Sequence, residues 1–318
     1  YLGQEVVPNS GCGSWLLEPQ STNLVTYSEN FSQWYIDGNQ SSPTIISELN
    51  PDGSSQVYQI NLNSGGNIYR TISISSSIDY TFSVYIKGTG NGRLILSNPQ
   101  STPENYVDFT ATSEWQRIEL TGSSSSTSVR IAIGSWSDSS ASGTIQIFGA
   151  QVEQQSYATS YIPTSGATST RLQDIATNSG NASLINSEEG VLYAEISALV
   201  GSGGGTRRIE ISNGAFASQY VRIQIANGDG SLYVIANNGS QQYLFNYTSF
   251  TATSSNKIAI KYKANDYALW VNGVEIDSQS SGATFANGVL TQANFASISG
   301  PFYGKNKALA VYKTALTD

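Results

Sequence analysis

The chain has 318 residues, more than one hydrophobic core usually spans, so we expect two domains of about 130 to 160 residues each. Only 12% of the residues are charged, and 19 are Tyr, a composition typical of an extracellular β-protein with a polar, uncharged surface. A net charge of −8 without a basic cluster excludes nucleic acid as a favoured partner. No apolar run approaches the roughly 20 residues of a membrane span, so membrane insertion is not expected.

The residue types that are absent or rare limit the chemistry. There is no His, the usual general base at neutral pH and the commonest transition-metal ligand. No P-loop, zinc spacing or Ser-His-Asp triad occurs, so we do not expect an enzyme, although acids distant in sequence could still form a glycosidase pair. The single Cys, Cys12, is either a small buried hydrophobe or a thiol that bridges identical chains. A chain that begins at Tyr1 and contains no Met is expected to be a piece of a longer polypeptide.

The first half of the chain alternates short apolar strands with turns. Residues 1–22 form a lead-in with few periodic features. After it, a Pro-Asp-Gly turn at 51–53 and similar turn residues separate the predicted strands. These strands are 23–28, 57–62, 68–74, 80–86, 93–96, 115–120, 129–133 and 144–148. Short strands at this spacing, without a helical period between them, predict an antiparallel sandwich over 23–163, and we favour a jelly roll.

The second half has its own strand pattern. Residues 164–187 are rich in Thr, Ser, Asn and Gly and are predicted to be a linker or a strand-exchange segment. From 188 to 318 the predicted strands are 190–196, 208–211, 220–225, 232–235 and 243–245, followed by a hairpin over 257–276 and a closing strand within 302–314. Asn272-Gly273 is expected to make a tight turn inside that hairpin. The fold class is therefore all-β, with two tandem antiparallel β-sandwiches.

Several separated motifs resemble one family. The segments SGCGSWLLEPQSTNL (10–24), YSENFS (27–32), GAQVE (149–153) and TSYIPT (159–164) are similar, in this order, to a module of bacteriophage tail-fibre and tail-spike proteins. The segments LYAE (192–195), IAIKYKANDYALWVNG (258–273) and VYKTALTD (311–318) resemble a laminin-G/concanavalin-A-like domain that often follows this module. Such chains usually continue beyond the last motif.

The resemblance implies a carbohydrate-binding-module-like jelly roll followed by a laminin-G/concanavalin-A-like sandwich. It also implies a virion tail location, homotrimers, contacts with other virion tail proteins and recognition of a bacterial surface polysaccharide or glycan. It does not determine the ligand, and the shared motifs look structural. Jelly-roll carbohydrate modules often hold one structural calcium ion, and the backbone near Glu29 with the side chain of Gln151 would be the analogous site.

A sugar site needs an exposed aromatic face and polar groups for the hydroxyls. In the first domain, Trp136 and Asp138 lie in a polar loop, where Trp136 is either a ligand contact or a packed loop anchor. Tyr106 is a weaker candidate of the same kind. Trp15, Trp34 and Trp115 lie in the shared motifs and are expected in the core.

In the second domain, the strand period places Trp270 and Lys261 on the outer face of the predicted hairpin. This face is either a carbohydrate-binding surface or a contact with a neighbouring subunit or domain. Tyr303 and the pair Tyr220 and Arg222 are further candidates for binding.

Three functions remain open at this point. The favoured function is a non-enzymatic tail-fibre adhesin that recognises a bacterial cell-surface glycan. One alternative is a purely structural, trimeric virion decoration, in which Trp136 and Trp270 would be buried between chains. The other is an accessory carbohydrate-binding region of a secreted polysaccharide-degrading enzyme.

Overall fold

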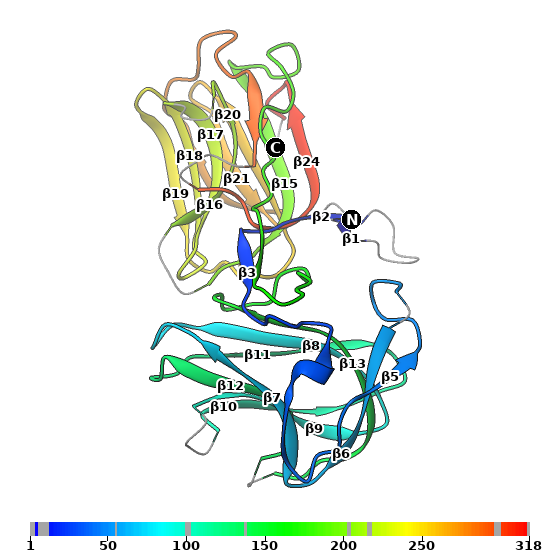
Figure 1. The fold of residues 1–318 in the computed structure, drawn as a ribbon. Helices are drawn as coiled ribbons and strands as arrows, with labels where there is room; N and C mark the ends of the chain where they lie inside the picture. Colours follow the sequence, from blue (N-terminus) through cyan, green and yellow to red (C-terminus); the bar gives the residue numbers. More distant parts are fainter. Residues whose placement is uncertain are drawn as a thin grey trace. The chain divides into compact units, whose positions relative to one another are not determined.

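The structure, a computed structural model, describes residues 4–5, 13–54, 56–98, 103–136, 139–201, 205–214, 218–295 and 300–316. It divides the chain into two compact units, one of Gln20–Leu172 and one of Tyr1–Pro19 with Gln173–Asp318. We call them the first sandwich and the second sandwich. Both are built from antiparallel strands (Figure 1), which confirms the predicted all-β fold class. In the described part of the chain, no helix is long and apolar enough to cross a membrane.

The first sandwich has two layers. One layer has the order β11-β8-β13-β6-β5, and the other has the order β10-β9-β12-β7-β4. Their bounds are Tyr35–Gly38 (β4), Thr44–Ser47 (β5), Gln56–Asn63 (β6), Gly66–Ser73 (β7), Tyr80–Gly88 (β8), Asn91–Ser97 (β9), Asn105–Thr110 (β10), Gln116–Gly122 (β11), Ser128–Gly134 (β12) and Ser142–Glu153 (β13). A bridge between Ser142 and Asn91 joins the layers. Successive strands switch between layers repeatedly, which is jelly-roll connectivity.

The apolar core of the first sandwich lies between these layers. Alternate residues of each strand face it, as Leu94 and Leu96 do from β9 and Ile131 and Ile133 do from β12. Sequence alternation therefore located most of these strands. Strands β4, β5 and β10 were not predicted; they are short and have few core residues.

Asn23 connects the start of the first sandwich to its last long strand. It ends β3 (Ser21–Asn23) and is fully buried. Its Nδ2 donates to the carbonyls of Ala150 and Ile162 at 3.1 and 2.8 Å. Its Oδ1 accepts from the backbone N–H of Val152 and Val25 at 3.1 and 3.0 Å. All the hydrogen-bonding capacity of this amide is used to hold backbone, so the motif around it is structural.

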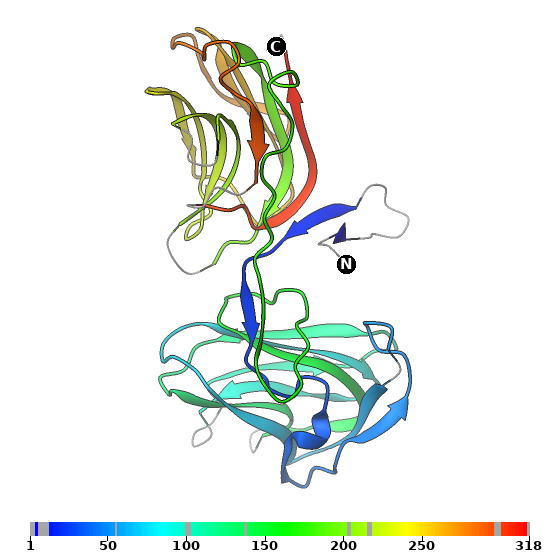
Figure 2. The ribbon, with the colours of Figure 1, turned by 45° about the horizontal axis from the view of Figure 1, so that its top comes forward.

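The second sandwich also has two layers (Figures 1 and 2). One sheet has the order β1-β2-β24-β15-β20-β21-β22 and the other β19-β18-β17-β16-β23. Their bounds are Gln4–Glu5 (β1), Ser14–Leu17 (β2), Glu189–Ala198 (β15), Thr206–Ser212 (β16), Gln219–Ala226 (β17), Leu232–Asn238 (β18), Gln241–Tyr247 (β19), Asn256–Lys263 (β20), Tyr267–Val271 (β21), Val274–Gln279 (β22), Gln292–Asn294 (β23) and Gly304–Tyr312 (β24). Apolar side chains of both sheets form one core between them.

The predicted hairpin is confirmed as β20, β21 and β22. Ile258, Ile260 and Leu269 face the core, as the alternation indicated. The turn between β21 and β22 has φ of 54° at Asn272 and 85° at Gly273. Two successive positive φ angles match the tight hairpin turn for which Asn-Gly is the preferred pair.

The lead-in and the linker are divided between the two units. Trp15 and its neighbours in β2 pair with β24, so residues 14–17 belong to the second sandwich. This pairing satisfies backbone groups that a short strand cannot satisfy alone. β14 (Ser169–Arg171) pairs with β3 in the first sandwich, and the chain from Gln173 onward joins the second.

The three tryptophans expected in the core differ in how deeply they are buried. Trp34 is 4% exposed and packs against Phe31, as expected. Trp15 is 55% exposed, because it lies on an added strand outside the main core. Trp115 is half-buried, and its Nε1 donates to the carbonyl of Leu49 at 3.1 Å. Cys12 lies outside the described residues.

Candidate functional site

The outer face of the layer β10-β9-β12-β7-β4 carries a row of tyrosines. The strand register places Tyr106, Ile95, Ala132, Tyr69 and Tyr35 opposite one another, each on a different strand. The row faces away from the core, because the residues that flank Ile95 and Ala132 on their strands point inward. At about 4.8 Å per strand, the row spans about 19 Å. We call this surface the tyrosine face.

Tyr106 is held flat against an arginine. The guanidinium carbon of Arg93 lies 3.7 Å from the centroid of the Tyr106 ring. Asp108 fixes that guanidinium, accepting from Nε at 2.7 Å and from Nη2 at 3.3 Å. The Arg93 side chain is 8% exposed and Tyr106 is 47% exposed, so the ring covers the arginine and its opposite side is open to solvent.

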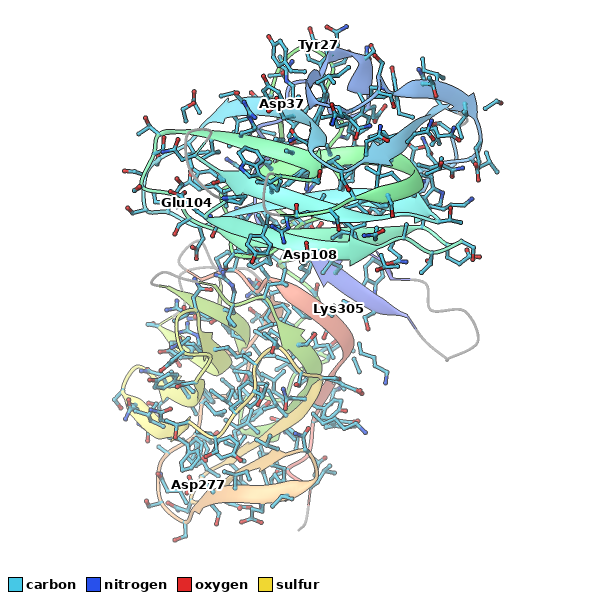
Figure 3. All side chains as sticks on the ribbon, turned by 90° about the horizontal axis from the view of Figure 1, so that it is seen from below. Tyr27, Asp37, Glu104, Asp108, Asp277 and Lys305 are labelled. Carbon is cyan, nitrogen blue, oxygen red and sulfur yellow. The ribbon has the colours of Figure 1, made fainter. Side chains whose placement is uncertain are left out.

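A second arginine organises the other aromatic rings of the tyrosine face. The guanidinium carbon of Arg130 lies 3.8 Å from the Tyr69 ring centroid and 5.3 Å from that of Trp136. Its Nη1 donates to Asp37 Oδ2 at 2.6 Å. The Tyr35 and Tyr69 rings lie 5.5 Å apart. Arg130 thus connects Trp136 to the tyrosine row, and Figure 3 labels Asp37 and Asp108, the acids that hold the two arginines.

A polar hollow lies where β9 and β10 meet the loop after β12. Its volume is about 460 Å³, and Asn91, Arg93, Asp108, Thr110 and Ser139 are among its lining residues. The backbone N–H of Trp136 donates to Ser139 Oγ at 2.9 Å. The hollow offers amide, carboxylate and hydroxyl groups, and it shares Arg93 and Asp108 with the Tyr106 stack.

This arrangement is suited to binding a sugar. The apolar side of a pyranose packs on a flat aromatic ring, and its hydroxyls bond to nearby polar groups. Tyr106 supplies the ring and the hollow supplies the polar groups. The side chains are fixed by one another before any ligand arrives, which lowers the entropy lost on binding.

The structure brings two of the predicted site residues to one surface. Tyr106 and Trp136 both belong to the tyrosine face, although 30 positions separate them in the chain. Asp138 lies outside the described residues. Sequence reasoning missed Arg93, Arg130 and Tyr69. The sequence signal for Arg93 and Arg130 was an arginine at an outward-facing position of an otherwise apolar strand. Such a guanidinium lies against the sheet only where a neighbouring side chain pairs with it.

Tyr303 is not on a surface. It is 7% exposed, donates from Oη to Gln173 Oε1 at 2.6 Å and lies 4.8 Å from the Arg207 guanidinium. Burial raises the pKa of its phenol. We therefore correct its assignment from a binding residue to a packing residue of the second sandwich.

Tyr220 and Arg222 form a compact stack on β17. The guanidinium carbon of Arg222 lies 3.6 Å from the Tyr220 ring centroid, and its Nε donates to Glu210 Oε2 at 2.6 Å. Glu210 is 1% exposed and Arg222 is 8% exposed. Arg222 pairs with the buried carboxylate of Glu210, so the charge of the arginine is already neutralised within the sheet.

The proposed calcium ligands do not fit an ion. Gln151 is fully buried, and its Oε1 accepts from the backbone N–H of Ile162 at 2.7 Å. In the backbone next to Glu29, the Ser28 carbonyl accepts from the backbone N–H of Ala150 at 2.9 Å. Glu29 Oε1 accepts from Tyr161 Oη at 3.0 Å. Calcium binds six to eight oxygens, usually including carboxylates, and no group of three acidic, His or Cys side chains occurs among the described residues. We assign no calcium to this pair.

Comparison with known proteins gives distant likenesses. No protein-family model and no curated protein matches the chain. The solved CBM40 of the Ruminococcus gnavus IT-sialidase, bound to α2,3-sialyllactose, aligns over 46% of this chain and 90% of its own, with 19% identity and a TM-score of 0.37. A structure titled "CBM4 structure and function" covers 44% of this chain and 97% of its own, with 16% identity and a TM-score of 0.30. Domains LG4-5 of the mouse laminin alpha1 chain cover 88% of this chain and 92% of their own, with 10% identity and a TM-score of 0.30.

Proposed function

We propose that the first sandwich binds carbohydrate, without catalysis, at the tyrosine face. The main observation behind this proposal is that the Tyr106 ring stacks on the Arg93 guanidinium, which Asp108 holds by a hydrogen bond. The stack leaves Tyr106 47% exposed, and the same Arg93 and Asp108 line the polar hollow. A ring fixed in this way is a ready surface for the apolar side of a sugar.

The biological setting of the proposal comes from the sequence motifs. They lead us to propose that the chain is part of a phage tail fibre, displayed on the virion tail as a homotrimer. The ligand would then be a bacterial surface glycan, and other tail proteins would hold the fibre. An accessory region of a secreted polysaccharide-degrading enzyme would use the same surface, so carbohydrate binding is common to both settings.

The experiment is a glycan array of bacterial capsules and O-antigens, followed by titration calorimetry on the best glycan. Tyr106→Ala should weaken binding about three- to tenfold, because one ring stack contributes roughly 1 kcal/mol. Ile45→Ala is the control, since Ile45 is 58% exposed on β5 in the other layer. Unchanged affinity in Tyr106→Ala, or no binding to any glycan, would contradict the proposal.

The proposed homotrimer and the proposed adhesin role need separate measurements. Sedimentation equilibrium of the chain tests the homotrimer, and a monomer at all concentrations would contradict it. Competition by the purified chain against phage adsorption to host cells tests the adhesin role. An enzyme accessory region would instead raise the retention of a polysaccharide-degrading partner on its insoluble substrate.

A further inference from the structure

The outer face of the seven-stranded sheet in the second sandwich carries three aromatic residues. The register aligns Trp270, Ala259, Tyr193 and Ala310 across β21, β20, β15 and β24. Tyr312 lies diagonally from Tyr193, opposite Val191. Leu192, Ala194 and Ile260, which alternate with these residues, face the core. We call this surface the indole face.

The orientation of the Trp270 ring is fixed from beneath. Lys261 Nζ lies 5.5 Å from the ring centroid, and its side chain is only 4% exposed. Asp266 Oδ1 holds this ammonium group at 2.8 Å. Lys261 was expected on a face that either binds carbohydrate or contacts a neighbouring subunit or domain; its burial makes it a support for the indole. A desolvated cation against one face of a Trp ring is a strong attraction, so the ring is held in place before a ligand binds.

The other two rings of the indole face, Tyr193 and Tyr312, are partly exposed. Tyr312 is 47% exposed and Tyr193 is half-buried. Burial, and then the nearby charge of Glu195, raise the pKa of Tyr193. Ala259 and Ala310, the register neighbours of Tyr193, have only methyl side chains, which are too small to cover the rings. The result is a track of three rings across four strands.

Charged groups surround this track. Lys257, Glu275 and Lys307 are exposed, and Lys307 Nζ also lies 3.0 Å from Glu195 Oε1. Covering these charges with a second copy of the chain would remove them from water, which costs free energy unless each one is paired. Charged residues are depleted from the cores of protein interfaces for this reason. Sugar hydroxyls, in contrast, can bond to them while the rings stack.

We infer that the indole face is a second carbohydrate-binding site, which takes a chain of pyranose sugars along Trp270, Tyr193 and Tyr312. It lies on a different unit from the tyrosine face and does not depend on the function proposed for that face. Two sites on one chain would raise the avidity for a repetitive surface polysaccharide beyond the affinity of either site.

The test uses the whole chain on an array of bacterial surface polysaccharides. We compare wild type, Tyr106→Ala, Trp270→Ala and the double variant. Tyr106→Ala should retain binding to some glycans, and adding Trp270→Ala should weaken that binding about three- to tenfold, the loss of one ring stack. Trp270→Phe should retain most of the affinity, since it keeps a ring. Val274→Ala, at a 60% exposed residue on β22, is the matched control.

Thermal melting of each variant checks that it is folded, and Tyr312→Ala provides a second, more exposed test of the same track. Three results would overturn the inference. The Tyr106→Ala chain could bind no glycan, or Trp270→Ala and Tyr312→Ala could leave the residual binding unchanged. Trp270→Ala could also change the sedimentation coefficient without changing glycan binding, which would make this face a subunit contact.

Discussion

Arg93 and Tyr106 form a stacked pair, with the guanidinium carbon 3.7 Å from the ring centroid, and Asp108 anchors the arginine by two hydrogen bonds. Removing the arginine should therefore release the ring. We expect Arg93→Met to weaken glycan binding about two- to fivefold, since a cation–π pair with a partly exposed ring is worth roughly 0.5–1 kcal/mol. Titration calorimetry measures this effect. Asp108→Asn should have a smaller effect in the same direction, and a gain in affinity in either variant would contradict this role.

Asn23 should be essential to the stability of the first sandwich. Asn23→Ala leaves four buried backbone groups without partners, at Ala150, Ile162, Val152 and Val25. We expect a loss of about 3 kcal/mol or more in the free energy of unfolding of this unit. Urea unfolding followed by fluorescence measures it. Asn63→Ala, at an exposed residue on β6, should change the free energy by less than about 0.5 kcal/mol.

Arg222 should stabilise the second sandwich mainly because it neutralises the buried charge of Glu210. Arg222→Met leaves Glu210 charged, buried and unpaired, which should cost about 3–5 kcal/mol. The double variant Glu210→Leu with Arg222→Met removes both charges and should recover most of that loss. Chemical unfolding of the two single variants and the double variant tests this coupling. Additive losses would show that the pair is not coupled.

The turn at Gly273 should tolerate Asn better than Ala. Its φ is 85°, and no atom lies within 4 Å of where a Cβ would be, so any cost of a side chain there is conformational. Gly273→Ala should lower the free energy of unfolding by about 1–2 kcal/mol. Gly273→Asn should lower it less, because Asn adopts positive φ more readily. Equal losses in the two variants would indicate a contact rather than backbone strain.

Alkaline pH should destabilise the second sandwich. Burial raises the pKa of Tyr267 to about 12, and burial also raises the pKa of Tyr243 and Tyr262. The folded state favours the neutral phenol, so stability is fully present below the pKa of a free tyrosine, about 10. It should fall as the pH rises from there through about 12. The ultraviolet absorbance of tyrosinate, recorded with circular dichroism, should show these residues ionising together with unfolding; ionisation near pH 10 in the folded protein would contradict this expectation.

The sequence by itself determined the long strands and their faces. Alternation of apolar residues located the long strands of both sandwiches, because the period of two is a local property of the chain. It also placed Trp270 and Lys261 on one outer face, and Asn272-Gly273 specified its own turn. The composition pointed to an all-β protein.

Only the tertiary structure decided which faces carry binding groups. Tyr106, Tyr69 and Tyr35 form one row because β10, β9, β12, β7 and β4 pair in an order that differs from their order in the chain. Pairing also moved Trp15 into the second sandwich, and packing buried Lys261 and Tyr303. Register and burial depend on contacts between residues that are far apart in sequence. A local pattern shows which side of a strand a residue occupies, but not what lies over it.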